Sequence, residues 1–135
     1  MTGQLGGPQG PRDPGNPDER GGPPSADQVR DEISREILRI HEESYGSGAG
    51  KAKTFVGEDF VVVVLDGLEL LPPERLLIEG GLGDMVIQVR ARYQQAIRDT
   101  FSAAVERATG RRVVGFASST SVEEHRFAAE IFRLE

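Results

Sequence analysis

Hydrophobic side chains first recur at a regular spacing just after residue 25. The intervals are four, four and three, in the positions Val29, Ile33, Ile37 and Ile40. This spacing puts them on one face of a helix. Ser25 precedes the stretch and Gln28 stands three positions later, the spacing of a capping box. We therefore predict an amphipathic helix that starts near Ser25 and ends near Ser44.

Two β-branched runs follow, "KTFV" and "DFVVVVLDG", and a short turn containing Gly57 joins them. Runs of this kind around a glycine-containing turn predict a β-hairpin. The second run is apolar on both faces, as in a central strand. We expect helices to cover one of its faces and a partner or another layer to cover the other.

The rest of the chain alternates helical and strand patterns. Pro72 and Pro73 open a predicted short helix, "ERLLIE", which the glycines at 80 and 81 end. A long helix is predicted from Gly83 to Thr109, with Gly110 as its left-handed cap. Its expected apolar stripe is Val86, Val89, Tyr93, Ile97, Phe101, Ala104 and Ala108. "RRVVGFA" and "RFAAEIFRL" are typical of strands, and "SSTSVEEH" between them is typical of a polar turn.

The element order is helix, strand, strand, short helix, long helix, strand, strand. Paired hairpins without regular βαβ alternation favour an antiparallel sheet with its helices on one face. We therefore predict an α+β fold in which the N-terminal helix and the long helix pack on one face of an antiparallel four-stranded sheet.

Residues 1–25 differ in composition from the rest. They hold six of the eight prolines and seven of the seventeen glycines, with almost no large apolar side chains. Such a segment cannot bury enough apolar surface to offset its ordering entropy. We predict a disordered tail over residues 1–25 and a single domain over residues 26–135.

Charge and composition argue against several classes of function. A net charge of -6 disfavours binding to nucleic acid, because that binding neutralises phosphates with Lys and Arg. There is no cysteine and therefore no disulfide or thiolate chemistry. No apolar run approaches the length of a membrane-spanning helix. We expect a cytoplasmic protein that does not insert into the membrane.

The stretch "YGSGAGKAKT", residues 45–54, invites comparison with a phosphate-binding loop. A Walker loop needs a glycine where Tyr45 stands and a hydroxyl where Ala52 stands. Such a loop also runs from a strand into a helix, whereas this one leaves a helix and enters a strand. We interpret Gly46–Gly50 as a helix-to-strand connector, with Gly46 ending the helix.

Residues with catalytic or metal-binding chemistry do not form a recognised pattern. His41 and His125 lack the ligand spacing of a zinc site. The hydroxyl run from Ser118 to Ser121 lacks a nucleophile elbow and an assignable acid. We therefore predict no catalytic residue, no metal, no cofactor and no enzymatic activity.

Basic side chains are the remaining candidates for a site. Arginine forks match carboxylates and phosphates, so an anion or an acidic partner would suit them. The candidates for such a contact are Lys51, Lys53, Arg107, Arg111 and Arg112. A solvated helix face, with its last turn complementing the helix dipole, is the alternative explanation for the arginines.

Three stretches resemble the MpsC-like family, which is named for a Na+-translocating, membrane-potential-generating system. They are "YGSGAGKAKTFV", the "LPPE" turn, and "ATGRRVVGF" followed by an F-x-L-E end. The similarity spans nearly everything after the tail. The junction departs from the family pattern G-x-G-P, because Ala49 stands in the place of the proline.

The resemblance implies a non-catalytic accessory or interaction domain, a peripheral subunit of an ion- or bicarbonate-linked membrane system at the inner face of the membrane. It supplies no catalytic residues. Strands with two apolar faces add an expectation of self-association, as a homodimer or a higher oligomer. The alternative is a regulatory domain that binds a small anion or a nucleotide.

Overall fold

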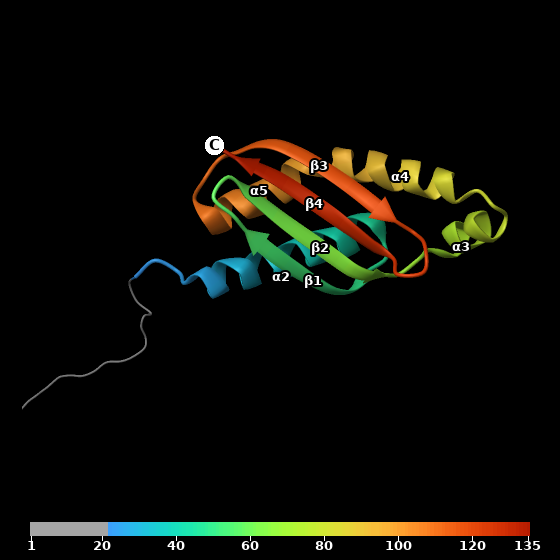
Figure 1. The fold of residues 1–135 in the computed structure, drawn as a ribbon, viewed down its shortest axis with the longest axis horizontal. Coiled ribbons are helices and arrows are strands. Elements are labelled where there is room, and N and C mark those ends of the chain that lie inside the picture. Colours follow the sequence, from blue (N-terminus) through green and yellow to red (C-terminus); the bar gives the residue numbers. More distant parts are fainter. Residues whose placement is uncertain (1–21) are drawn as a thin grey trace, which may run out of the picture.

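The computed structural model describes residues 22–135, so most of the predicted disordered tail lies outside the described residues. Four helices and four strands follow in the predicted order, except that two helices stand in place of the predicted long one (Figure 1). The helices are α2 (Ala26–Tyr45), α3 (Pro72–Glu79), α4 (Gly83–Ala96) and α5 (Arg98–Thr109). The strands are β1 (Ala49–Val56), β2 (Phe60–Leu68), β3 (Val113–Ser121) and β4 (Phe127–Leu134).

The strands form one antiparallel sheet in the order β1-β2-β4-β3. The hairpin predicted around Gly57 joins β1 to β2, and the Gly57 amide donates to the carbonyl of Phe60 at 2.7 Å. β2 is a central strand, as its two apolar faces predicted. The helices lie on one side of the sheet and leave the other side without a covering layer among the described residues (Figure 1). The predicted α+β architecture is confirmed.

Local capping signals set the ends of α2. The Ser25 hydroxyl accepts from the Gln28 amide, and the Gln28 side chain accepts from the Ser25 amide. Gly46 ends the helix with a positive φ of 87°, which is strained for any residue with a Cβ. The predicted helix and its terminator are confirmed.

The predicted long helix consists of two helices that meet at Ile97. There φ is -102° and ψ is 11°, outside the helical range. Gly110 caps α5 with φ of 70°, as predicted. The predicted stripe is wrong at Val89 and Tyr93, which are exposed. The buried positions of α4 are Val86, Arg90 and Gln94.

The core lies between the helices and the inner face of the sheet. Phe101 of α5 packs near Phe116 of β3 and Phe132 of β4, with ring centroids 6.3 and 6.5 Å away. The other core side chains are mainly aliphatic and come from α2, α5 and the two central strands. This single core fixes the sheet and leaves its outer face free.

The hydroxyl run from Ser118 to Ser121 belongs to β3, so the predicted turn there is wrong. Ser118 lies opposite Glu130 and Ser121 opposite Phe127 in the pairing with β4. Sheet pairing therefore outweighs the turn preference of serine at these positions. The connection between β3 and β4 comes later, at residues 122–126.

Candidate interaction surface

The outer face of the sheet is the most distinctive surface of the domain, and we call it the open face. Its side chains alternate along the strands with those that point into the core. An apolar row crosses all four strands, because Phe55 pairs with Val62, Val62 with Ile131, and Ile131 with Ala117. The other members are Lys51, Lys53, Phe60, Val64, Asp66, Ser119, Ser121, Phe127, Ala129 and Arg133.

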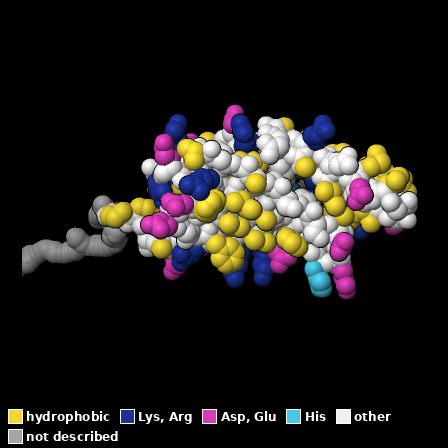
Figure 2. Space-filling model, turned by 45° about the horizontal axis from the view of Figure 1, so that its top comes forward, with side chains coloured by type: hydrophobic (Ala, Val, Ile, Leu, Met, Phe, Trp, Pro, Cys, Tyr) yellow, Lys and Arg dark blue, Asp and Glu magenta, His cyan; other side chains and the backbone are white. Residues whose placement is uncertain are grey.

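Aromatic rings on the open face are solvent-exposed to an unusual degree. Phe55 is 49% exposed, and Phe60 and Phe127 are each 42% exposed. Yellow side chains gather over the sheet in the space-filling view (Figure 2). Contiguous exposed apolar patches on soluble domains mark contact sites for partners. This face therefore has the character of a binding surface.

Positive charge accompanies the apolar row. Lys51, Lys53 and Arg133 lie on the open face, against the single carboxylate of Asp66. The Lys53 ammonium and the Arg133 guanidinium each lie 5.3 Å from a ring centroid, of Phe55 and Phe60 respectively. The open face is thus basic, although the chain as a whole carries -6. Its charge suits an acidic partner.

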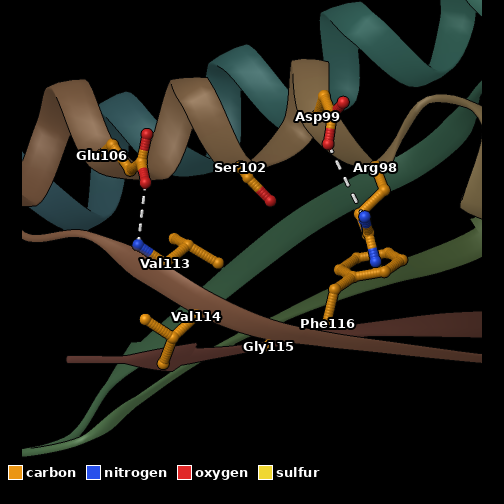
Figure 3. Close-up of a pocket in the computed structure, with 8 residues that line it drawn as sticks. All are labelled: Arg98, Asp99, Ser102, Glu106, Val113, Val114, Gly115 and Phe116. Carbon is orange, nitrogen blue, oxygen red and sulfur yellow. Dashed lines mark hydrogen bonds and ion pairs between the residues drawn. The ribbon is translucent and has the colours of Figure 1, made fainter.

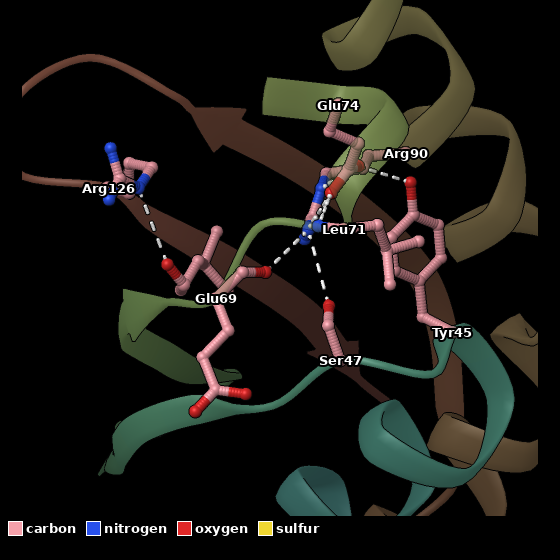
Figure 4. Close-up of polar contacts among 8 residues, drawn as sticks. Tyr45, Ser47, Glu69, Leu71, Glu74, Arg90 and Arg126 are labelled. Carbon is pink, nitrogen blue, oxygen red and sulfur yellow. Dashed lines mark hydrogen bonds and ion pairs between the residues drawn. The ribbon is translucent and has the colours of Figure 1, made fainter. Parts of the chain in front are cut away.

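Behind the sheet, a buried ion pair ties α4 to α3. Arg90 donates from Nε and Nη2 to the two carboxylate oxygens of Glu74, each at 2.8 Å (Figure 4). Nη2 also donates to the backbone carbonyl of Glu69 at 3.0 Å. Tyr45 donates its hydroxyl hydrogen to Glu74 at 2.5 Å, and its ring lies 4.4 Å from the guanidinium. One arginine therefore joins the end of α2, the segment after β2, α3 and α4.

The pKa values of this group follow from its contacts. Burial alone would raise the pKa of Glu74, but hydrogen bonds from Arg90, Tyr45 and the Leu71 amide lower it overall. Burial and the hydrogen bond to Glu74 raise the pKa of Tyr45. Glu74 is therefore ionised at neutral pH and Tyr45 is neutral. This is the charge state of a structural ion pair.

The glycine connector is held by the protein's own groups. The Gly48 amide donates to the Glu69 carboxylate at 3.2 Å, and the Gly48 carbonyl accepts from the Glu69 amide at 2.9 Å. A Cβ at Gly48 would come within 2.6 Å of the Glu42 carboxylate. The connector is therefore packed against other parts of the chain where it enters β1. The carboxylates of Glu42 and Glu69 lie beside it, whereas a bound phosphate would need positive charge there.

The predicted basic candidates separate into two groups. Lys51 and Lys53 lie on β1 at the open face. Arg111 contacts the carbonyls of Glu58 and Glu135 and lies near Asp59, while Arg112 holds the Glu135 carboxylate at 2.8 and 3.2 Å. Arg107 is exposed in the last turn of α5. The five residues do not share one site, and anion binding by either group stays a prediction.

Two other buried groups were not foreseen from the sequence. Glu130 points into the core from β4, and burial raises its pKa to about 7 despite the neighbouring Ser118 hydroxyl. His41 of α2 is also buried, and burial together with the charge of Arg90 lowers its pKa to about 4. Neither carboxylate oxygen of Glu130 and neither ring nitrogen of His41 has a hydrogen-bond partner among the described residues.

Metal-binding geometry is missing from the described part of the chain. Within residues 22–135, no three His, Asp or Glu side chains come together as ligands. His41 lies inside the protein, and His125 is exposed between β3 and β4.

Sequence signals existed for part of what was missed. Arg90 falls between Val86 and Gln94 at intervals of four, on the side of α4 that faces the core. A buried charge on such a stripe requires a partner of opposite charge. Glu74, which directly follows the two prolines, was available for that role. For Glu130, the alternation with Ala128 and Phe132 would have indicated burial.

Residues 22–135 contain no helix that is long and apolar enough to cross a membrane. No curated protein and no solved structure matches the chain. A family model described as "Na+-translocating membrane potential-generating system (MpsC)" matches residues 25–135, which is nearly the whole described domain. The chain therefore belongs to the MpsC family, which associates it with a Na+-translocating membrane system.

Proposed function

We propose that this chain is a non-catalytic accessory domain that binds a protein component of the membrane system through its open face. The observation that carries this proposal is the apolar row from Phe55 through Val62 and Ile131 to Ala117, which no described residue covers. Burying such a row stabilises a complex because it removes apolar surface from water.

The chemistry of the open face defines the partner. Lys51, Lys53 and Arg133 exceed the single Asp66 by two charges, counted as three cations minus one anion. A partner segment with apolar side chains and flanking carboxylates would satisfy both the row and its charges. We place the domain at the inner face of the membrane, as a peripheral subunit.

Co-purification from native membranes tests this proposal. The full chain would carry an affinity tag, and the variant Phe55→Ser/Phe60→Ser would remove two exposed rings from the open face. Both rings are more than 40% exposed, so the fold should tolerate the change. Leu76→Ser/Met85→Ser removes two exposed apolar side chains, 72% and 49% exposed, from the helical layer and is the matched control.

The proposal predicts that a membrane component of the system co-purifies with the wild type and the control, and that its recovery falls at least about tenfold with the open-face variant. Recovery should also fall as the salt concentration rises, because the basic side chains of the open face contribute to association. Equal recovery with all three proteins would overturn the assignment of this face.

A further inference from the structure

The outer edge of β3 carries no charge and no proline, although α4 and α5 contact the strand from the helical side of the sheet. β3 is the last strand of the sheet, and no described strand pairs with its outer side. Its sequence, "VVGFASSTS", has no charged residue and no proline over nine residues. Exposed edges of this kind are usually blunted by charges or proline, because free amides and carbonyls would otherwise pair with another strand. The opposite edge strand, β1, carries Lys51 and Lys53.

The start of this edge is closed by the protein itself. The Glu106 carboxylate accepts a hydrogen bond of 2.8 Å from the Val113 amide (Figure 3). The register with β4 also shifts between Val113 and Gly115, as at a β-bulge. The regular part of the edge is therefore Gly115–Ser121, and any added strand would be centred there.

Charges flank β3 with opposite signs at its two ends. Arg111 and Arg112 precede the strand, where both also contact Glu135 of the same chain, and the exposed pair Glu123 and Glu124 follows it. In an antiparallel pairing of two identical strands, the basic start of one lies beside the acidic end of the other. The pattern is therefore complementary to itself, which is what a two-fold contact between identical chains requires.

We propose that two copies of this chain pair through β3, antiparallel and centred on Ala117 or Ser118, to form one continuous sheet. A centre at Ala117 sets Arg111 opposite Glu123 of the second copy, and a centre at Ser118 sets Arg112 opposite Glu124. With either centre, each residue lies opposite a residue whose side chain is on the same face of its own sheet. The helices of the two copies therefore lie on the same side of the joined sheet.

The surroundings of the strand agree with this arrangement. A cavity of about 350 Å³ runs along Val113–Phe116, and Arg98 of α5 lines it with a half-exposed side chain (Figure 3). With the pairing centred on Ser118, Glu123 of the second copy lies beside Val113, at this cavity. The open face is a poorer surface for self-association, since its net positive charge would face itself.

Pairing through β3 is independent of the partner proposed for the open face. It leaves the open face uncovered, and two copies would present it as one larger surface. Failure of the membrane co-purification would not affect it, and a monomeric chain would leave the co-purification result in place.

Sedimentation equilibrium of the full chain tests the inference. We expect a dimer at micromolar concentrations. Ala117→Lys/Ser119→Lys puts like charges opposite each other with either centre, and should raise the dimer Kd about tenfold or more. Phe55→Lys adds a charge to the same face at the far strand, and should leave the dimer Kd unchanged. Circular dichroism would show that both variants are folded.

A charge exchange tests the orientation of the strands. With the centre at Ser118, Arg112→Glu should weaken the dimer, and adding Glu124→Arg should restore it. With the centre at Ala117, Arg111→Glu and Glu123→Arg should behave in the same way. Because the chain contains no cysteine, Ala117→Cys and Ser119→Cys would report cross-strand contact by disulfide formation without background. A monomer throughout, or a dimer that Phe55→Lys disrupts and Ala117→Lys/Ser119→Lys does not, would overturn the inference.

Discussion

Arg90 donates hydrogen bonds to both carboxylate oxygens of Glu74 inside the protein. The Arg90 side chain is 0% exposed and the Glu74 side chain is 7% exposed. The pair connects two helices that make few other contacts with the core. It also supports the segment between β2 and α3 through the Glu69 carbonyl. The position of α4 relative to α3 therefore depends on a buried polar contact as well as on the apolar packing of Val86.

Arg90→Met should destabilise the domain by about 3–5 kcal/mol, because it leaves the Glu74 carboxylate buried without its partner. The free energy of unfolding from urea titration measures this. Arg39→Ala removes an exposed arginine that pairs with Glu36 and Glu43, and it should cost less than about 1 kcal/mol. Equal losses for the two variants would contradict a structural role for the buried pair.

Glu130 should make stability fall as pH rises. Its folded pKa of about 7 exceeds the ordinary 4.5, so between these values the folded state keeps a proton that the unfolded state has lost. The penalty grows from pH 4.5 to pH 7 and amounts to about 3 kcal/mol. Glu130→Gln should remove this contribution, which a comparison of the variant with the wild type by unfolding measurements from pH 4 to 8 would show.

His41 should act in the opposite direction. Its folded pKa of about 4 lies below the ordinary 6.5, so the unfolded state gains a proton first as pH falls, and stability drops from pH 6.5 to pH 4. The slopes of His41 and Glu130 cancel between pH 4.5 and 6.5. Unfolding free energy should therefore rise with pH in Glu130→Gln and fall with pH in His41→Leu. Parallel curves for the two variants would contradict the assignment.

Gly46→Ala should cost about 1 kcal/mol. Gly46 has φ of 87°, and a Cβ there meets no atom within 4 Å, so the cost comes from the backbone conformation alone. Gly80 has φ of -84° and is the matched control, where alanine should be close to neutral or stabilising. Thermal unfolding of the two variants compares them. A Gly46→Ala protein as stable as Gly80→Ala would show that α2 ends differently.

The sequence supported a large part of this fold because its signals were local. The turn at Gly57, the cap at Ser25 and the terminators Gly46 and Gly110 each depend on neighbouring residues. The apolar faces of Val61–Leu65 likewise indicated a central strand.

The missed features depend on contacts between distant elements. The strand character of Ser118–Ser121 comes from pairing with β4, and serine by itself favours a turn. The burial of Arg90 depends on a carboxylate sixteen positions earlier in the chain. The open face could be anticipated from its apolar alternation. Its positive charge could not, because that depends on the strand register that places Arg133 opposite Phe60.

Photo-crosslinking in native cells tests the central claim most directly. A photoreactive aromatic residue would replace Phe55 at the open face or Leu76 at the helical layer, both exposed positions. The account predicts that the probe at position 55 cross-links to a membrane component of the Na+-translocating system and that the probe at position 76 does not. Cross-links to that component from position 76 alone would contradict it.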